Sequence, residues 1–228
     1  MNTIMAVGAH TGDAQLTCGL LLSRQAAKGD RIITLDLTAG ERGCPAHLSL
    51  AEFRQMNVES AALFAHHLGG KSIVMDTPDG ELEATQALAL QIADLMREHQ
   101  VTTVLQHWKN SMHKDHVAAF KLTQDAIFYA SLPTFERPFP PAPIRSWYYA
   151  ENWEDSEGFV PYAYFDVSET FETWKAAVKQ LYLTEHSRDF RYLQYYEGLA
   201  RARGALIKTD YATAFATDDY AKRIRPNL

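Results

Sequence analysis

Short apolar runs alternate with segments of helical periodicity along the first 131 residues, and this alternation constrains the fold most. The expected strands are runs of β-forming residues at 4–7, 31–38, 72–75 and 101–105. The expected helices have apolar residues three and four apart and span 13–28, 49–67, 85–99 and 116–130. Strands that alternate with helices through short connections favour a parallel sheet with helices on both faces, because each parallel connection crosses over the sheet. The sequence therefore predicts a Rossmann-like α/β fold.

The remaining residues, 132–228, have a different character. Five prolines between 133 and 143 exclude a regular helix there. Two further strands are expected at 144–150 and 162–167, and two long amphipathic helices at about 169–186 and 190–206. No repeat or linker separates the two parts, so we expect a single domain over 1–228, with a Rossmann-like half at 1–131 and added strands and helices at 132–228.

Charge and composition narrow the class of partner. The 228 residues carry a net charge of −6 with no block rich in lysine and arginine, which argues against nucleic acid or an anionic membrane surface. No apolar run approaches the ~20 residues of a membrane helix. Cys18 and Cys44 have no metal-type spacing, which favours a reducing cytoplasm. We therefore expect a cytoplasmic protein with a small-molecule partner, and the sequence is compatible with a homo-oligomer.

Two loops at the expected carboxyl ends of strands carry residues of the metal-ligand type. The first is His10-Thr11-Gly12-Asp13, and the second is His113-Lys114-Asp115-His116. In a doubly wound sheet the first and fourth strands flank the point where the strand order reverses, and ligands bind there. We therefore expect His10, Asp13 and His116 to meet. Such a set leaves a fourth zinc position open for water and favours metal-assisted hydrolysis of an amide or ester.

Each of these residues also has a structural interpretation. His10 taken alone could be a loop histidine, and Asp115 taken alone is a good helix N-cap. The other histidines lack a partner loop of this kind, and we expect them on the surface or in the core: His47, His66, His67, His99, His107 and His186.

Both loops resemble motifs of the PIG-L/LmbE-like zinc N-deacetylases. Residues 9–14, Ala-His-Thr-Gly-Asp-Ala, resemble the Ala-His-Pro-Asp-Asp-Glu signature of that family, and residues 113–116 resemble its His-Pro-Asp-His motif. Three more segments match in order: 38–43 resembles a Thr-x-Gly-Glu-x-Gly loop, 79–81 an Asp-Gly-Glu turn, and 211–215 a Tyr-Ala-Glu-x-Phe motif. The resemblance extends from about residue 4 to residue 216. It implies removal of acetyl from an N-acetylglucosamine-type small glycoconjugate.

The resemblance also implies a role for each matching residue. Zinc would be bound by His10, Asp13 and His116. His113 would polarise the acetyl carbonyl or stabilise the oxyanion, with Asp115 holding it in orientation. Glu41 and Arg42 would lie in a loop beside the substrate.

One position departs from the family motif in a way that bears on catalysis. Gly12 stands where the family has the aspartate that acts as general base. Loss of a positioned base typically costs ~10²–10⁴ in rate. The alternatives are a slow enzyme, an enzyme in which Glu41 supplies the carboxylate, and a catalytically silent metal- and sugar-binding relative. Dinucleotide binding is disfavoured, because His10 stands at the second glycine position of a Gly-x-Gly-x-x-Gly loop.

Overall fold

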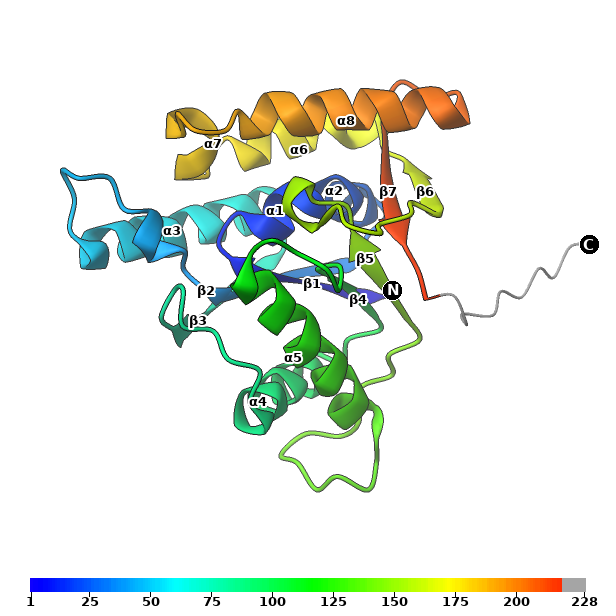
Figure 1. The fold of residues 1–228 in the computed structure, drawn as a ribbon. Helices are drawn as coiled ribbons and strands as arrows, with labels where there is room; N and C mark the ends of the chain where they lie inside the picture. The colour runs from blue at the N-terminus through cyan, green and yellow to red at the C-terminus, as the bar shows by residue number, and fades with distance from the viewer. Residues whose placement is uncertain (219–228) are drawn as a thin grey trace, which may run out of the picture.

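A computed structural model describes residues 1–218, whose strands form one seven-stranded sheet in the order β3-β2-β1-β4-β5-β7-β6 (Figure 1). The strands are β1 Thr3–His10, β2 Arg31–Thr38, β3 Lys71–Thr77, β4 Thr103–Gln106, β5 Ser146–Ala150, β6 Ala163–Asp166 and β7 Ala212–Ala216. Neighbours from β3 to β5 are parallel, whereas β7 is antiparallel to both β5 and β6. The predicted Rossmann-like α/β fold is confirmed.

Helices cover both faces of the sheet (Figure 1). One face carries α4 and α5, and the other carries α1, α2 and α3, with α6 and α8 stacked further out. The helices are α1 Asp13–Thr17, α2 Gly19–Ala27, α3 Leu50–His67, α4 Gln86–Glu98, α5 Lys114–Ser131, α6 Phe171–Val178, α7 Tyr182–His186 and α8 Tyr192–Ile207. Short 3-10 turns lie at η1 Glu41–Gly43, η2 Trp153–Asp155 and η3 Ser168–Thr170. None of the helices in residues 1–218 combines the length and apolarity needed to cross a membrane.

Strand β1 lies inside the sheet and is buried on both faces. Ile4 and Ala6 pack in the cluster that includes α2 and α6, whereas Met5 and Val7 pack in the cluster that includes α4 and α5. Successive side chains of a strand point to opposite faces, so a strand covered on both sides needs a continuous apolar run. This packing fixes β1 and places its last residue, His10, at the carboxyl edge of the sheet.

The single helix expected at 13–28 is divided at Cys18 into α1 and α2. Two local features lie at the division. The hydroxyl of Thr17 donates to the carbonyl of Asp13 at 2.8 Å, and Gly19 lies against the buried indole of Trp174. A helix with a side chain in place of Gly19 could not approach α6 so closely.

The helix expected at 169–186 is also divided, into η3, α6 and α7. Leu181 between α6 and α7 has an extended backbone and is buried in the core. The hydroxyl of Thr184 donates to the carbonyls of Val178 and Leu181, at 2.9 and 2.8 Å, which satisfies backbone groups at the end of α6. The division turns α7 toward the carboxyl edge of the sheet and brings Leu183 over Gly12.

The proline-rich segment 132–143 contains no helix or strand, as predicted. The buried guanidinium of Arg97 organises it by donating to four backbone carbonyls, those of Tyr129, Leu132, Phe135 and Phe139. This arrangement satisfies carbonyls that the irregular backbone leaves without strand or helix partners.

Candidate metal centre

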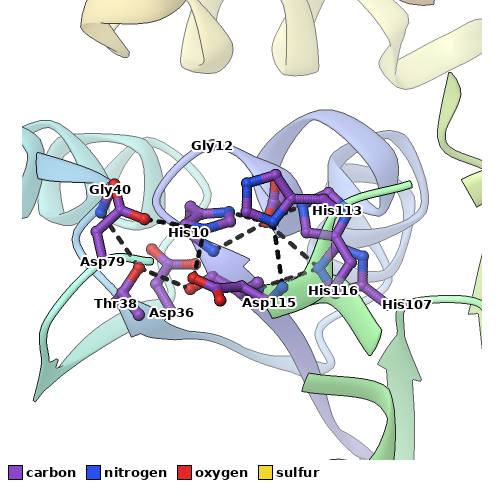
Figure 2. Close-up of polar contacts among 12 residues, drawn as sticks. His10, Gly12, Asp36, Thr38, Gly40, Asp79, His107, His113, Asp115 and His116 are labelled. Carbon is purple, nitrogen blue, oxygen red and sulfur yellow. Dashed lines mark hydrogen bonds and ion pairs between the residues drawn. The ribbon is translucent and has the colours of Figure 1, made fainter. Parts of the chain in front are cut away.

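Two loops meet at the carboxyl edge of the sheet, one after β1 and one after β4 (Figure 2). His10 ends β1, Asp13 begins α1, and Gly12 between them has φ 116° and ψ −35°. His116 lies in the first turn of α5. Because β1 and β4 are neighbouring parallel strands, Asp13 contacts both His10 and His116, as predicted. In residues 1–218, three groups have ligand atoms that all lie within 4.8 Å of one another: Asp13 with His107 and His116, His10 with His113 and His116, and His10 with Asp79 and Asp115.

The polar atoms of these residues suit a metal ion. Oδ2 of Asp13 lies 3.2 Å from Nδ1 of His10 and 3.4 Å from Nε2 of His116. Nδ1 of His116 donates to Asp155 at 2.9 Å, so in the neutral ring Nε2 faces the Asp13 carboxylate with a lone pair. A cation bound between these two atoms would be held by both lone pairs. Ligand atoms of a tetrahedral zinc site lie about 3.4 Å apart, given bonds of ~2.0–2.2 Å, so both distances from Asp13 agree with the spacing of zinc ligands.

Asp155 holds a second histidine as well. Its Oδ2 accepts from Nδ1 of His107 at 2.8 Å, while Nε2 of His107 accepts the backbone N–H of Ala9 at 3.0 Å and lies 3.3 Å from Asp13. The prediction that His107 has no metal-type neighbours is therefore wrong. The alternation of β4 does not reveal this, because His107 follows the strand and its direction depends on Asp155 in η2.

Asp13 and Asp155 are ionised in this surrounding. Burial alone would raise the pKa of Asp155, but the hydrogen bonds from His107 and His116 lower it to about 2. Burial also opposes ionisation of Asp13, yet His116, His10 and His107 hold its pKa well below the ordinary value. Both carboxylates thus remain negative, as a metal ligand and the acceptor behind another ligand need to be.

The far side of His10 contacts two more carboxylates. Its Nε2 lies 3.2 Å from Asp79 and 3.3 Å from Asp115, and Asp115 also accepts the backbone N–H of Gly80 at 2.8 Å. Burial alone would lower the pKa of His10, but Asp115, Asp13 and Asp79 together raise it to about 12. The metal-free ring is therefore protonated, and binding of a metal through Nδ1 would release a proton.

Asp115 does not hold His113 in the way that we expected. Its carboxylate contacts His10 and Gly80, and only its backbone N–H reaches His113, donating to Nδ1 at 3.2 Å. Burial and the nearby charges of His10 and His116 lower the pKa of His113. With Nδ1 acting as an acceptor, the proton of the neutral ring is on Nε2, where it can be donated to a ligand oxygen. The ring stacks on His116 with centroids 4.8 Å apart.

Glu41 and Arg42 both hydrogen-bond Asp79 at the edge of the centre. Oε1 of Glu41 accepts the backbone N–H of Asp79 at 2.9 Å, and Oε2 lies 3.5 Å from the Arg54 guanidinium. The backbone N–H of Arg42 donates to Asp79 at 2.9 Å, while its exposed side chain pairs with Glu81. Within residues 1–218, no hydrogen bond or ion pair of Glu41 reaches the histidine cluster.

Glu154 is a further carboxylate at the centre, outside both predicted ligand loops. It lies in η2 next to Asp155, and its Oε2 is 3.9 Å from Nε2 of His116. Burial raises the pKa of Glu154. The positive charge of His116 would lower this pKa, but the negative charges of Asp13 and Asp155 raise it further. The available signal was an acidic segment following the expected strand at 144–150, which could have placed Glu154 and Asp155 at the same edge as His116.

The place of a side chain at residue 12 is occupied. A β-carbon built on Gly12 would collide with Cδ2 of Leu183 from α7, and the positive φ angle already disfavours any residue but glycine. The backbone and the packing at residue 12 therefore both suit glycine.

Comparison with known proteins decides the family. The sequence profile of the PIG-L family, described as GlcNAc-PI de-N-acetylase, matches residues 5–127. The chain belongs to the PIG-L family. The profile includes both loops of the metal centre and ends before η2, so Glu154 and Asp155 lie outside the matched residues.

Relatives of this PIG-L chain include a hydratase and deacetylases. A 4-oxalmesaconate hydratase of Pseudomonas putida is 24% identical over 214 residues, which cover 90% of this chain and 80% of the hydratase. The structure of GalB, the 4-carboxy-2-hydroxymuconate hydratase of P. putida, has a TM-score of 0.90 at 22% identity and covers 100% of both chains. The N,N'-diacetylchitobiose deacetylase of Pyrococcus horikoshii has a TM-score of 0.81 at 18% identity, covering 94% of this chain and 83% of the deacetylase. PIG-L membership supports a hydrolytic or related activity.

Proposed function

We propose that this PIG-L protein is a zinc-dependent hydrolase that removes an N-acetyl or similar N-acyl group from an N-acetylglucosamine-type small glycoconjugate. The contacts of Asp13 with both His10 and His116 carry the proposal, together with the Asp155 hydrogen bond that turns Nε2 of His116 toward Asp13. When bound there, zinc would polarise the acyl carbonyl and increase the acidity of water. In the reaction the water oxygen bonds to the acyl carbon, the carbon–nitrogen bond breaks, and the amine nitrogen takes a proton.

The residues around the ligands have complementary roles in this proposal. His113 donates from Nε2 to the oxygen that becomes negative as water adds to the carbonyl. Arg42, exposed at the rim, contacts the glycoconjugate. Glu41 holds the 79–80 turn in place, and with it the Asp79 carboxylate beside His10.

The proposed setting is cytoplasmic, with a small molecule as partner and neither nucleic acid nor membrane involved. The free thiols of Cys18 and Cys44 are consistent with a reducing compartment. A homo-oligomer is compatible with this setting.

Hydration of a carbon–carbon double bond is a second candidate. Two features favour it. The overlay on the Pseudomonas hydratase GalB covers both chains completely, and Gly12 stands where the family motif that this loop resembles has an aspartate. In a hydration the water oxygen bonds to one carbon and a proton to the other, and no carbon–nitrogen bond is broken.

An assay with both substrate classes tests the proposal. The zinc-loaded protein is incubated with N-acetylglucosaminides and, separately, with conjugated unsaturated dicarboxylic acids, while free amine and loss of ultraviolet absorbance are measured. We expect amine release that His116→Ala abolishes. Loss of absorbance without amine release would establish the hydratase instead, and turnover in neither assay would favour the silent binding relative.

A further inference from the structure

Residue 12 itself provides no proton acceptor, and its surroundings favour glycine. Gly12 has a φ angle of 116°, and Leu183 fills the space that a side chain would enter. Leu183 is itself packed against the core cluster of α2 and α6. A proton acceptor for water must therefore come from another element.

Most carboxylates that contact His10, His107 or His116 are already occupied. The Asp13 carboxylate faces three imidazoles and accepts a hydrogen bond from the backbone N–H of His10. The Asp115 carboxylate accepts a hydrogen bond from the backbone N–H of Gly80, and the Asp79 carboxylate accepts one from the backbone N–H of Arg42. Asp155 accepts from two histidines. These bonds fix the orientation of each carboxylate, so none of the four is free to turn toward a water molecule and a substrate.

Glu154 differs from the other four carboxylates. Its backbone is held on both sides: the carbonyl accepts from the N–H of Met112 at 3.1 Å and the hydroxyl of Ser111 at 3.3 Å, and the N–H donates to Asn152 at 3.3 Å. Its carboxylate accepts no hydrogen bond from residues 1–218, is 20% exposed, and lies 3.9 Å from Nε2 of His116. A fixed backbone, and a carboxylate without a hydrogen-bond donor beside a candidate ligand atom, are what a general base requires.

We infer that Glu154 replaces the missing aspartate as the group that accepts the proton of the attacking water. The inference rests on the proposed hydrolase function. One water proton passes to the Glu154 carboxylate as the oxygen bonds to the acyl carbon. When the carbon–nitrogen bond breaks, the same proton passes to the amine nitrogen, and Glu154 is again a carboxylate.

The variant Glu154→Gln tests this inference, because glutamine keeps the size of the side chain and cannot accept the proton. The matched control is Glu157→Gln, an exposed residue of the same loop. We expect Glu154→Gln to bind zinc as the wild type does, to keep its KM, and to lose ~10²–10⁴ in kcat, while Glu157→Gln keeps wild-type kcat. Equal kcat values in the wild type and Glu154→Gln would overturn the inference. Loss of zinc from Glu154→Gln would also overturn it, because Glu154 would then be a metal ligand and not the base.

Restoring a carboxylate at position 12 gives a second test. In the Glu154→Gln background, the double change Gly12→Asp with Leu183→Ala should recover at least ~10-fold of the lost kcat, if the defect is a missing base. Leu183→Ala alone should recover nothing. Recovery by Leu183→Ala alone would contradict the inference, because it would show that Glu154→Gln acts on access to the centre.

A crystal structure of the zinc-loaded protein separates this inference from the proposed function. We expect a water molecule within ~2.6–3.2 Å of the Glu154 carboxylate and beside the ligands His10, Asp13 and His116. A Glu154 carboxylate bonded to zinc, or turned away from the water, would overturn the inference whatever the substrate. Absence of amine release by the wild type would count against the hydrolase function. The position of this water would still show whether the Glu154 carboxylate is placed to accept its proton.

Discussion

The carboxylate of Asp155 orients two histidines of the candidate metal centre, His107 and His116. In Asp155→Asn one oxygen becomes an NH2 group, which cannot accept from an imidazole N–H. We expect zinc affinity to fall ~10–100-fold, the usual effect of losing such a partner behind a ligand. Competition with a chromophoric chelator measures it. Unchanged affinity in Asp155→Asn, with Glu157→Gln as the control, would show that His116 does not need this orientation.

Asp36 makes stability depend on pH. The side chain is buried beneath the centre and accepts from Nε2 of Gln15 at 2.8 Å, and burial raises its pKa from 3.8 to about 8 despite that hydrogen bond. The folded chain therefore keeps a proton that the unfolded chain releases. The stabilisation is complete below about pH 4 and is lost as pH rises to about 8, at up to ~1.4 kcal/mol per pH unit.

Asp36→Asn should remove this dependence, because the amide stays neutral and its oxygen can still accept from Gln15. We expect urea unfolding in the presence of a chelator to show a smaller fall in the free energy of unfolding between about pH 5 and pH 8 for the variant than for the wild type. Parallel curves for the two proteins would mean that Asp36 does not hold a proton in the folded state.

The ligand loops could be predicted at residue level because each is local in sequence. His10 and Asp13 are three residues apart, and His116 follows a neighbouring strand. Glu154 and Asp155 could not be predicted as residues of the centre, because they come from a turn after β5 that is distant in sequence. Asp155 lies 39 residues beyond His116. His107 was misjudged for the same reason, since its neighbours are Ala9, Asp13 and Asp155.

At the level of elements, two helical glycines should respond in opposite ways to alanine. A β-carbon on Gly19 of α2 would lie 2.7 Å from the Trp174 indole and 3.2 Å from Phe64, whereas one on Gly198 of α8 would meet nothing within 4 Å. We expect Gly19→Ala to lower the free energy of unfolding by ~1–3 kcal/mol through overpacking. Gly198→Ala should raise it by ~0.4–1 kcal/mol, because alanine restricts the unfolded chain. Urea denaturation compares the two, and a Gly19→Ala protein as stable as the wild type would mean that α2 and α6 separate at little cost.

Periodicity predicted the elements of the parallel half well, but not the divisions within the helices. The strand at 31–38 and the helix at 49–67 agree with β2 and α3 within a residue. The division at Cys18 involves the close contact of Gly19 with Trp174, and the end of α6 involves the hydrogen bond from the Thr184 hydroxyl. Neither interaction can be read from the pattern of apolar residues. Strand β7 was missed because three of its five residues are alanine, which has little preference for strands.

For the whole molecule, metal binding should appear as added stability. The candidate ligands come from both sides of the β1–β4 boundary, so a metal would bind the folded chain and not the unfolded one. At a zinc concentration 100 times its Kd, the gain is about 2.7 kcal/mol. We expect the melting temperature to rise by roughly 5–10 °C over the chelator-treated protein. At the same zinc concentration, the rise in melting temperature should be smaller for Asp155→Asn than for the wild type. A rise in His116→Ala as large as in the wild type would mean that the metal binds elsewhere.

The position of β7 in the sheet sets the order in which the molecule can be completed during synthesis. β6 pairs with β7 and not with β5, and β7 lies between them. A ribosome makes β6 some fifty residues before β7, so β6 has no strand to join until residues 212–216 have left the exit tunnel. The nascent chain can form the parallel half early, while β6 can join the sheet only after β7 has paired with β5.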